Sequence, residues 1–494
     1  MRMSDMEAVM WAVEKDPALR SDFTVLTILD RVPTDKRLKQ MAERAIAAMP
    51  RLGQRVRSTP FRLAPPRWED DPEIDLDYHI RRVAIPPPGE MRQLLDAAAQ
   101  LAATPFDRSR PLWEFTLFEG LVGGKAGLLE KMHHTITDGV GGLKLSLALV
   151  DFERNPRRVT KTLTLEIAEE ERLQRVANPI PQGNVLSELA SGISDAVATQ
   201  ARRTRSAAAA GAALIAHPEH FPSVGKSMWN MLTSVQRQVI VGPHGYSRLF
   251  AQRSLGRRYD VTSVPFDRAR ETASATGVTV NDLFVTAITR AIGMYHEQQG
   301  ESLKHLRMAM PVNLRRRPGN HGANSFAPIR VVLPVILGEV RDALAATHDV
   351  LGRVQTEPVL EALGSIAGAA SALPTSALVS ITRQQTRSID FTTSNLRGAP
   401  QALYMAGALM EHNIPLGPRA NAPVNVTVMS YAGSLEHGIH TDPAAVTNPE
   451  AFVACIETAW SELFNLVSAR QRKRSPRAKS GPSAAPQRRV SDHF

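Results

Sequence analysis

Cysteine is almost absent from this chain of 494 residues, in which Cys455 is the single example. One thiol excludes an internal disulfide framework and is typical of a protein that works in a reducing compartment. Cys455 lies within a helical pattern, so we interpret it as a small core residue and not as a nucleophile.

Long hydrophobic runs are also lacking. No segment approaches the roughly 18 to 20 consecutive apolar residues of a membrane span, and the N-terminus has no basic segment followed by an apolar one. Hydrophobic residues make up 43% and charged residues 22% of the chain, which is the composition of a globular protein. We therefore expect a cytoplasmic protein that is soluble or attached peripherally to the inner face of the membrane.

The formal net charge of +10 is unevenly distributed along the chain. From Arg470 onward, eight Lys or Arg residues against the single acid Asp492 give +7, which leaves +3 for the preceding chain. Several prolines and serines accompany this charge, so we expect residues 470–494 to be a disordered basic tail. The tail suits either a solubilising appendage or adhesion to an anionic lipid surface. Nucleic-acid binding is disfavoured, because the preceding chain lacks both the charge and interleaved aromatic side chains.

The length of the chain predicts two subdomains, because a single core seldom grows this large. Strand-like and helical patterns alternate at both ends of the chain and give way in the middle to charged and Ala-rich segments, which include a long helical pattern over 185–213. The predicted fold class is therefore α/β. The expected divisions are an N-terminal subdomain (1–160), a helical linker or crossover (161–245), a C-terminal subdomain (246–469) and the tail (470–494).

Periodicity and propensity place the individual elements. In the first subdomain we expect strands over 23–29, 81–85 and 126–130, with helices over 35–49, 91–101 and 143–150. In the second we expect strands over 258–265, 308–312, 330–335 and 424–431, with helices over 267–276, 280–298 and 452–467.

The most informative stretch is His133-His134-Thr135-Ile136-Thr137-Asp138-Gly139, which has the pattern HHxxxDG. It lies between the strand expected over 126–130 and the helix expected from 143. Successive side chains of an extended segment point to opposite faces, so only one of His133 and His134 can face a given cleft. An imidazole with a pKa near neutrality is suited to take a proton from an alcohol. His134 is the favoured base, because it is nearer the aspartate and the turn.

Asp138 has two possible roles, since its carboxylate could orient the histidine or pair with an arginine and lock the loop. Gly139 favours the second role, because a sharp turn there would direct Asp138 away from the imidazole. A metal site is a rival interpretation of the His-His-Asp group. Adjacent histidines face apart, however, and no further His or Cys with ligand spacing follows. A pair of satisfied core histidines is the remaining alternative.

With these motifs in view, the chain resembles the bacterial wax ester synthase/diacylglycerol acyltransferase family. This family belongs to the CoA-dependent acyltransferases with the chloramphenicol acetyltransferase-like fold. HHxxxDG alone is shared with condensation domains, whereas Pro111-Leu112-Trp113 and Asn281-Asp282 point to the narrower family. The resemblance runs from about residue 3 to residue 468 and rests on Met3-Ser4-Asp5-Met6-Glu7-Ala8, Pro60-Phe61, Asp75-Leu76-Asp77-Tyr78-His79-Ile80, Phe106-Asp107-Arg108-Ser109-Arg110-Pro111-Leu112-Trp113-Glu114, HHxxxDG, Thr279-Val280-Asn281-Asp282, Pro311-Val312-Asn313-Leu314-Arg315, Gly322-Ala323-Asn324-Ser325, Ser394-Asn395-Leu396-Arg397-Gly398 and Asn425-Val426-Thr427-Val428-Met429-Ser430-Tyr431.

The resemblance implies two chloramphenicol acetyltransferase-like subdomains that face each other across an active-site tunnel. Acyl-CoA would enter from one side and the acceptor from the other. His134 would deprotonate the acceptor hydroxyl, and the alkoxide would attack the thioester with no covalent acyl-enzyme. Acyl-CoA would be a co-substrate, and we expect no cofactor and no metal. The expected products are triacylglycerol from diacylglycerol and wax esters from long-chain alcohols.

Site residues follow from the same resemblance. The catalytic group would comprise His134 with His133, Asp138 and Asn281. Asn281 would donate to the tetrahedral oxyanion from the N-terminal edge of a helix, although a helix cap is its alternative reading.

The remaining expected roles concern substrate contact and structural support. Gly139 and Trp113 would contact substrate, with a core or tunnel-wall position as the alternative for Trp113. Asp282 and Arg315 would be structural, and Arg315 would be the partner of Asp138 from the other half.

Two competing functions stay open. One is an acyltransferase that uses an acyl-carrier-protein donor, and the other is a catalytically weak lipid-surface protein. The expected partners are long-chain acyl-CoA and diacylglycerol or a long-chain alcohol, with peripheral association with a membrane or lipid droplet. The segment Tyr246 to Ser254 lacks the Asn-rich strand entry of many relatives, which leaves acceptor choice undecided.

Overall fold

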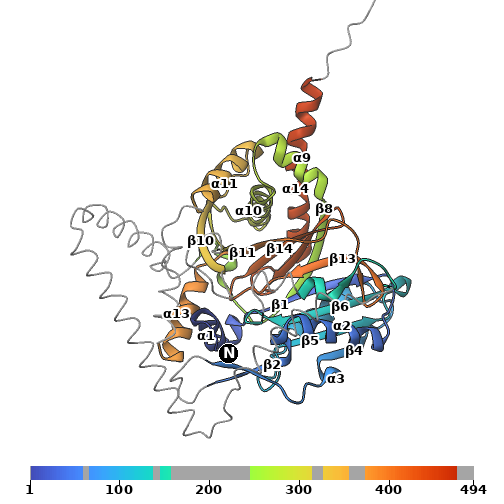
Figure 1. Cartoon of the computed structure of the whole chain (residues 1–494). Coiled ribbons are helices and arrows are strands. Elements are labelled where there is room, and N and C mark those ends of the chain that lie inside the picture. The colour runs from blue at the N-terminus through green and yellow to red at the C-terminus, as the bar shows by residue number, and fades with distance from the viewer. Residues whose placement is uncertain are drawn as a thin grey trace, which may run out of the picture.

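The structure of the chain is a computed structural model that describes residues 2–58, 66–136, 145–156, 245–313, 326–354 and 373–474. Within these ranges the chain forms two mixed α/β lobes, each built on its own sheet (Figure 1). The predicted α/β class is therefore confirmed. None of the helices in the described ranges is long and apolar enough to cross a membrane.

The first lobe contains a seven-stranded sheet in the order β4-β5-β6-β1-β13-β12-β7. Its central strand pairs are antiparallel, with β6 against both β5 and β1. Its strands are β1 (Asp22–Leu29), β4 (Ile80–Ala84), β5 (Trp113–Glu119), β6 (Ala126–His133), β7 (Val150–Asp151), β12 (Tyr404–Met405) and β13 (Ala408–Leu416), and its helices are α1 (Asp5–Val13), α2 (Asp35–Ala48), α3 (Leu76–His79) and α4 (Met91–Ala103), beside a small hairpin of β2 (Gln54–Arg57) and β3 (Arg67–Asp70).

The second lobe contains a six-stranded sheet in the order β10-β9-β11-β14-β15-β8. Its elements are β8 (Arg258–Pro265), α9 (Phe266–Thr276), α10 (Val280–Gln298), β9 (His305–Asn313), β10 (Phe326–Pro334), α11 (Val340–Val354), α13 (Thr375–Arg387), β11 (Phe391–Arg397), β14 (Val424–Tyr431), β15 (Ser434–Thr441) and α14 (Pro449–Arg474).

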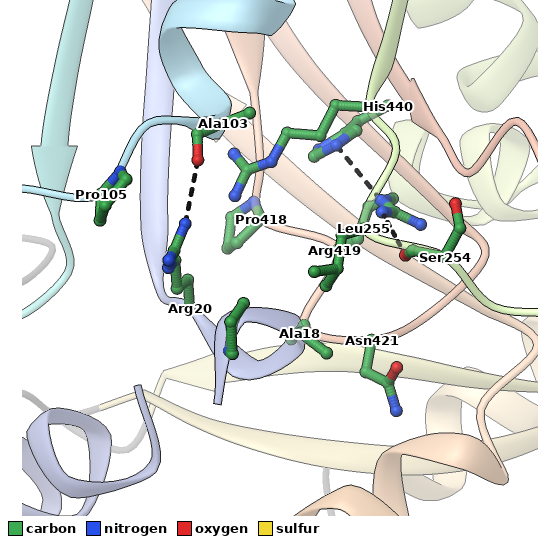
Figure 2. Close-up of a pocket in the computed structure, with 13 residues that line it drawn as sticks. Ala18, Arg20, Ala103, Pro105, Ser254, Leu255, Pro418, Arg419, Asn421 and His440 are labelled. Carbon is green, nitrogen blue, oxygen red and sulfur yellow. Dashed lines mark hydrogen bonds between the residues drawn. The ribbon is translucent and has the colours of Figure 1, made fainter. Parts of the chain in front are cut away.

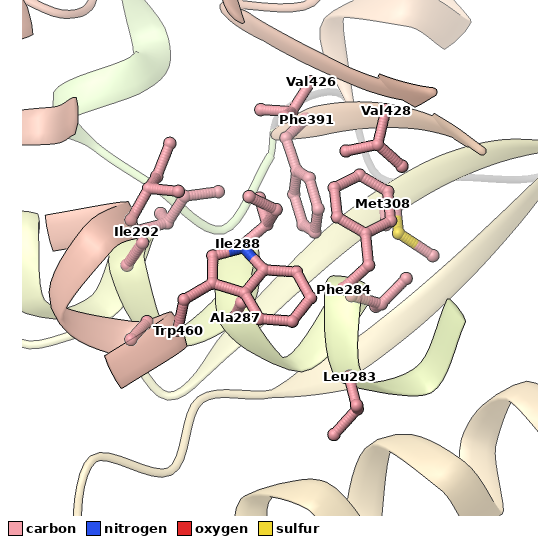
Figure 3. Close-up of a cluster of buried hydrophobic side chains, with 14 of the residues drawn as sticks. Leu283, Phe284, Ala287, Ile288, Ile292, Met308, Phe391, Val426, Val428 and Trp460 are labelled. Carbon is pink, nitrogen blue, oxygen red and sulfur yellow. The ribbon is translucent and has the colours of Figure 1, made fainter. Parts of the chain in front are cut away.

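Helix α10 is the centre of the second lobe's core. From Asp282 to Gly293 each of its residues is buried, because α10 lies between the sheet and helices α11 and α14. Figure 3 shows Phe284 and Ile288 of α10 beside Trp460 of α14 and Phe391 of β11. A helix that is buried on nearly all of its faces needs this enclosed position, and the packing anchors its N-terminal end, where Asn281 lies.

Strand β13 crosses from the second half of the sequence into the first lobe. It pairs antiparallel with β1, from Thr24 opposite Leu416 to Leu29 opposite Met410. It also packs on β14 and β15 of the second lobe. The division at residue 246 is therefore not the boundary between the lobes. The sequence pattern did not indicate this strand, because its place in the sheet depends on long-range pairing.

Most of the predicted elements agree with the structure. The expected strands over 258–265 and 424–431 and the helix over 280–298 have the bounds of β8, β14 and α10. The closing helix runs on to Arg474, so residues 470–474 are helical and do not belong to the expected disordered tail. Residues 475–494 of the tail, nearly all of the linker over 161–245 and its helical pattern over 185–213 lie outside the described residues.

Candidate active site

The candidate site begins where the central strand β6 ends. All eight residues of β6 are buried, the polar Glu130, Lys131 and His133 included, because the strand lies between two neighbours in the sheet. A turn follows, in which the N–H of Ile136 donates to the carbonyl of His133 at 3.0 Å. The pair of histidines thus lies at the C-terminal end of this interior strand, close to the start of β1.

His133 is fully buried and faces helix α1. Its Nε2 lies 2.8 Å from a carboxylate oxygen of Glu14, the residue that ends α1. Its Nδ1 lies 2.6 Å from the hydroxyl oxygen of Thr135 and accepts the backbone N–H of the same residue at 3.2 Å. The structure therefore places His133, which was predicted among the catalytic residues, in an anchor between α1 and β6.

His134 contacts residues at the start of β1. Its backbone N–H donates to the carbonyl of Ser21 at 3.1 Å, and its ring packs on Phe23 with centroids 4.8 Å apart. Desolvation, helped by the neighbouring His133, lowers the pKa of His134 to about 4, while the negative charge of Asp22 opposes that shift. The imidazole is therefore neutral near pH 7 and is able to accept a proton.

Arg51 links the turn to Glu7 of α1. Arg51 donates from Nη1 to the carbonyl of Thr135 at 3.0 Å and to the Glu7 carboxylate at 2.6 Å. Glu7 is buried and also closes the capping box of α1 with Ser4. In the sequence, Glu7 stands out only as part of a family motif, and the local pattern around Arg51 contains no signal of this contact.

A charged pair links the two lobes next to His134. The carboxylate of Asp22, the first residue of β1, lies 2.9 Å from Nη1 of Arg257, which precedes β8 of the second lobe. The two side chains are 3% and 13% exposed, so the pair is shielded from water. Asp22 was not among the predicted site residues. A carboxylate at the start of an apolar strand was the available signal, because such a buried charge requires a partner.

Glu130 is a second buried titratable group on β6. Its neighbours across the sheet are Val25 of β1 and Phe115 of β5. Burial raises the pKa of Glu130 to about 8, so its carboxyl is largely protonated at neutral pH. His134 is four positions further along the chain, which corresponds to about 13 Å in an extended strand.

The Asn281-Asp282 pair starts helix α10. Asp282 is buried and exchanges capping-box hydrogen bonds with Thr279, and its carboxylate also lies 2.9 Å from Nδ1 of His348. These contacts hold the first turn of α10, and the structural role of Asp282 stays a prediction. The Asn281 Oδ1 accepts a hydrogen bond from Asn395 of β11 at 3.3 Å. That contact uses the carbonyl oxygen of Asn281, whereas an oxyanion role requires its NH₂ group.

Trp113 lies in the core of the first lobe. It is 1% exposed, donates from Nε1 to the carbonyl of Leu52 at 2.7 Å and stacks on His79 with centroids 4.3 Å apart. The structure thus places it in the core position that was the alternative to substrate contact. The other predicted site residues, Asp138, Gly139 and Arg315, lie outside the described residues.

A cavity of about 330 Å³ lies at the junction of the lobes (Figure 2). The first lobe contributes Arg20 and the segment that follows α4, and the second contributes Arg257, Arg419 and His440. Figure 2 shows Arg20 bonded to the carbonyl of Ala103, and Arg419 bonded to His440. In the described part of the chain, no group of three or more His, Cys, Asp or Glu residues is arranged to hold a metal ion.

Sequence comparisons match nearly the whole chain to one family. Residues 3–284 match the wax ester synthase/diacylglycerol acyltransferase catalytic domain, and residues 322–464 match the C-terminal domain of the same family. A putative diacylglycerol O-acyltransferase of Mycobacterium tuberculosis is 30% identical over 478 residues, covering 94% of this chain and 93% of the relative. A probable diacylglycerol O-acyltransferase of the same organism, tgs1, is 27% identical over 442 residues, covering 88% and 89%.

Solved structures share the fold. The wax ester synthase/diacylglycerol acyltransferase from Marinobacter aquaeolei matches with a TM-score of 0.60 at 20% identity, over 95% of this chain and 100% of that chain. The first condensation domain of the calcium-dependent antibiotic synthetase, in complex with a substrate analogue, matches with a TM-score of 0.55 at 14% identity, over 95% and 96%. At these identities the matches establish the two-lobed fold alone.

Proposed function

Because the chain belongs to the wax ester synthase/diacylglycerol acyltransferase family, we propose that it transfers a long-chain acyl group from acyl-CoA to the hydroxyl of diacylglycerol, forming triacylglycerol. The observation that carries the proposal is His134, a neutral imidazole held at the end of a buried strand and close to the junction of two lobes. We propose acyl-CoA as a co-substrate, without a resident cofactor.

In the proposed reaction His134 is the general base. Its imidazole takes the proton of the acceptor hydroxyl while that oxygen attacks the thioester carbonyl. The tetrahedral intermediate then expels the CoA thiolate, which recovers the proton from the imidazolium. The carboxylate of Asp22 stabilises the transient imidazolium, since its charge acts on His134 in the sense that favours protonation.

The negative charge on the tetrahedral oxygen needs a preorganised donor, and we assign that role to the NH₂ group of Asn281. Its support is the position at the N-terminal edge of α10, where the helix dipole also favours negative charge. Three further residues keep the roles expected from the family motif. Asp138 pairs with Arg315 and so fixes the loop, and Gly139 lets substrate approach the backbone closely.

Direct transfer of the acyl group to the hydroxyl is the feature that separates this proposal from its alternatives. A carrier-protein enzyme would need acyl-carrier protein as donor, and a lipid-surface protein would bind lipid without releasing CoA. We place the enzyme at the surface of a membrane or lipid droplet, because its proposed acceptor and product are water-insoluble.

The decisive experiment is incubation of the purified protein with labelled palmitoyl-CoA and a mixture of diacylglycerol, long-chain alcohols and monoacylglycerol. We expect labelled triacylglycerol together with an equivalent amount of free CoA. If wax ester is the main product, the preferred acceptor is a long-chain alcohol and not diacylglycerol. A parallel reaction supplies labelled palmitoyl-carrier protein in place of palmitoyl-CoA. Transfer of label in that reaction alone, or lipid binding with no release of free CoA, would overturn the proposal.

A further inference from the structure

Resting on the proposed function, we propose that the cavity at the lobe junction is the binding site for the phosphate groups of the acyl donor, with Arg20 as the main side chain that contacts them. The shared chemistry is that of a phosphopantetheine thioester. Such a phosphate comes from free acyl-CoA or from a carrier protein, and the proposal favours CoA.

The lining of the cavity is positively charged. Arg20, Arg257 and Arg419 all line it, and none of its lining residues within the described ranges is Asp or Glu. A guanidinium group matches the geometry of a phosphate and can donate two parallel hydrogen bonds to it. A volume of about 330 Å³ is enough for part of a cofactor-sized ligand.

Two of these arginines are fixed by carboxylates behind the cavity wall. Arg257 pairs with Asp22 at 2.9 Å, and Arg419 pairs with Asp442 at 2.8 Å. Both are well buried, so their guanidinium groups are held in place and their charges are largely balanced. They shape a polar wall and add little net charge.

Arg20 differs from the other two arginines, because no carboxylate of the described residues forms an ion pair with it. It is half-buried and donates from Nη1 to the carbonyl of Ala103 at 2.9 Å, a neutral acceptor that leaves its charge in place. Because a guanidinium has five N–H donors, a single backbone contact orients Arg20 without using up its capacity for a ligand. Of the three lining arginines, Arg20 is therefore the one best able to bind an anion.

The cavity also lies next to the proposed base. Arg20 precedes Ser21, whose carbonyl accepts the N–H of His134, and Arg257 contacts Asp22, the next residue along β1. A ligand with its phosphates in the cavity and a flexible arm ending in a thioester is therefore suited to reach the imidazole. Because both lobes line the cavity, the site exists only when they are packed together.

The test uses Arg20→Gln in the full-length protein and measures binding of CoA and of pantetheine by calorimetry at fixed salt. We expect affinity for CoA to fall about tenfold, the effect of losing a hydrogen bond to a charged group, with pantetheine binding unchanged. With acyl-CoA as substrate, KM should rise more than kcat falls. Arg270→Gln, which removes the same charge from an exposed position of α9, should leave CoA affinity unchanged.

A second variant tests the site without altering charge. Ala18 lines the cavity and is only half-buried, so Ala18→Phe should fill the cavity without disturbing the core, and CoA binding should weaken. Wild-type affinity for CoA in both variants, or an equal loss of CoA and pantetheine binding in Arg20→Gln, would overturn the proposal. A greater loss with acyl-carrier protein than with acyl-CoA would reassign the phosphate to the carrier.

These outcomes separate the inference from the proposed function. If CoA binds in an Arg20-dependent way but no acyl group is transferred, the cavity assignment stands and the proposed function fails. If acyl-CoA is used normally by both cavity variants, the proposed function stands and the cavity assignment fails.

Discussion

A guanidinium nitrogen of Arg257 lies 2.9 Å from the carboxylate of Asp22, joining the two lobes at the residue before Phe23, on which His134 packs. The pair is shielded from solvent, and each partner comes from a different lobe. It therefore ties lobe packing to the electrostatic environment of the proposed base. Asp22 is a positioning residue in this arrangement.

Asp22→Asn should destabilise the fold by about 3 to 5 kcal/mol, because it leaves the charge of Arg257 buried without its partner. Removing the carboxylate also removes a charge that raises the pKa of His134, so the acid limb of the pH–rate profile should move to lower pH. Urea unfolding and kcat/KM against pH measure the two effects. The double variant with Arg257→Gln should recover part of the stability, and an additive loss would show that the pair is not coupled.

His134→Ala should lower CoA release by about 10² to 10⁴-fold, the usual contribution of a general base. The protein should remain folded, since the His134 ring lies at the end of the strand and not within it. His133→Ala is the matched control, because it removes the buried ring that contacts Glu14. It should lower the midpoint of thermal unfolding more than His134→Ala does. Equal turnover in wild type and His134→Ala would refute the base assignment.

The pH dependence of turnover should reflect the environment of His134. With a pKa of about 4 in place of 6.5, the base stays neutral as the pH falls from 8 to about 5, and kcat/KM should decline only below that range. An ordinary histidine would lose activity through pH 6.5. Below pH 6.5 His134 is protonated in the unfolded chain before it is protonated in the folded one, which favours unfolding. Circular dichroism at each pH separates this acid unfolding from the titration of the base.

Glu130 should make the fold less stable as the pH rises. Its pKa is about 8 in the folded chain against 4.5 ordinarily, so between these values the unfolded chain has lost a proton that the folded chain keeps. Stability falls across this window by at most about 1.4 kcal/mol per pH unit. Glu130→Gln should therefore be more stable than wild type at pH 8 and nearly equal to it at pH 4.5. Glu43→Gln, at an exposed position of α2, should show no such pH-dependent gain.

Removing residues 475–494 should weaken binding to anionic vesicles and spare activity on dispersed substrate. The truncation begins after Arg474 because α14 extends to that residue. Each basic residue near an anionic surface contributes about 1 kcal/mol, so the loss should disappear at high salt. Co-sedimentation with vesicles of neutral lipid is the control. Equal sedimentation of the full chain and the truncated chain with anionic vesicles would argue against a membrane role for the tail.

Local patterns predicted elements with a strong periodicity or propensity. The helix over 280–298 and the strand over 424–431 were placed correctly because each buries one or more faces along its whole length. Strands β11, β13 and β15 were not recognised, although each lies inside a sheet. Their polar residues, such as Asn413 and Glu436, are paired with partners distant in the chain and mask the alternation that marks a strand.

The sequence alone determined the family, the α/β class and the position of the paired histidines, because these depend on residue types at fixed spacing. Only the tertiary structure decided that His133 is an anchor to Glu14, that Arg51 braces the turn and that Asp22 meets Arg257 across the lobes. Such contacts join residues far apart in the chain. A buried charge requires a partner, but nothing in the surrounding sequence says which one the fold will bring to it.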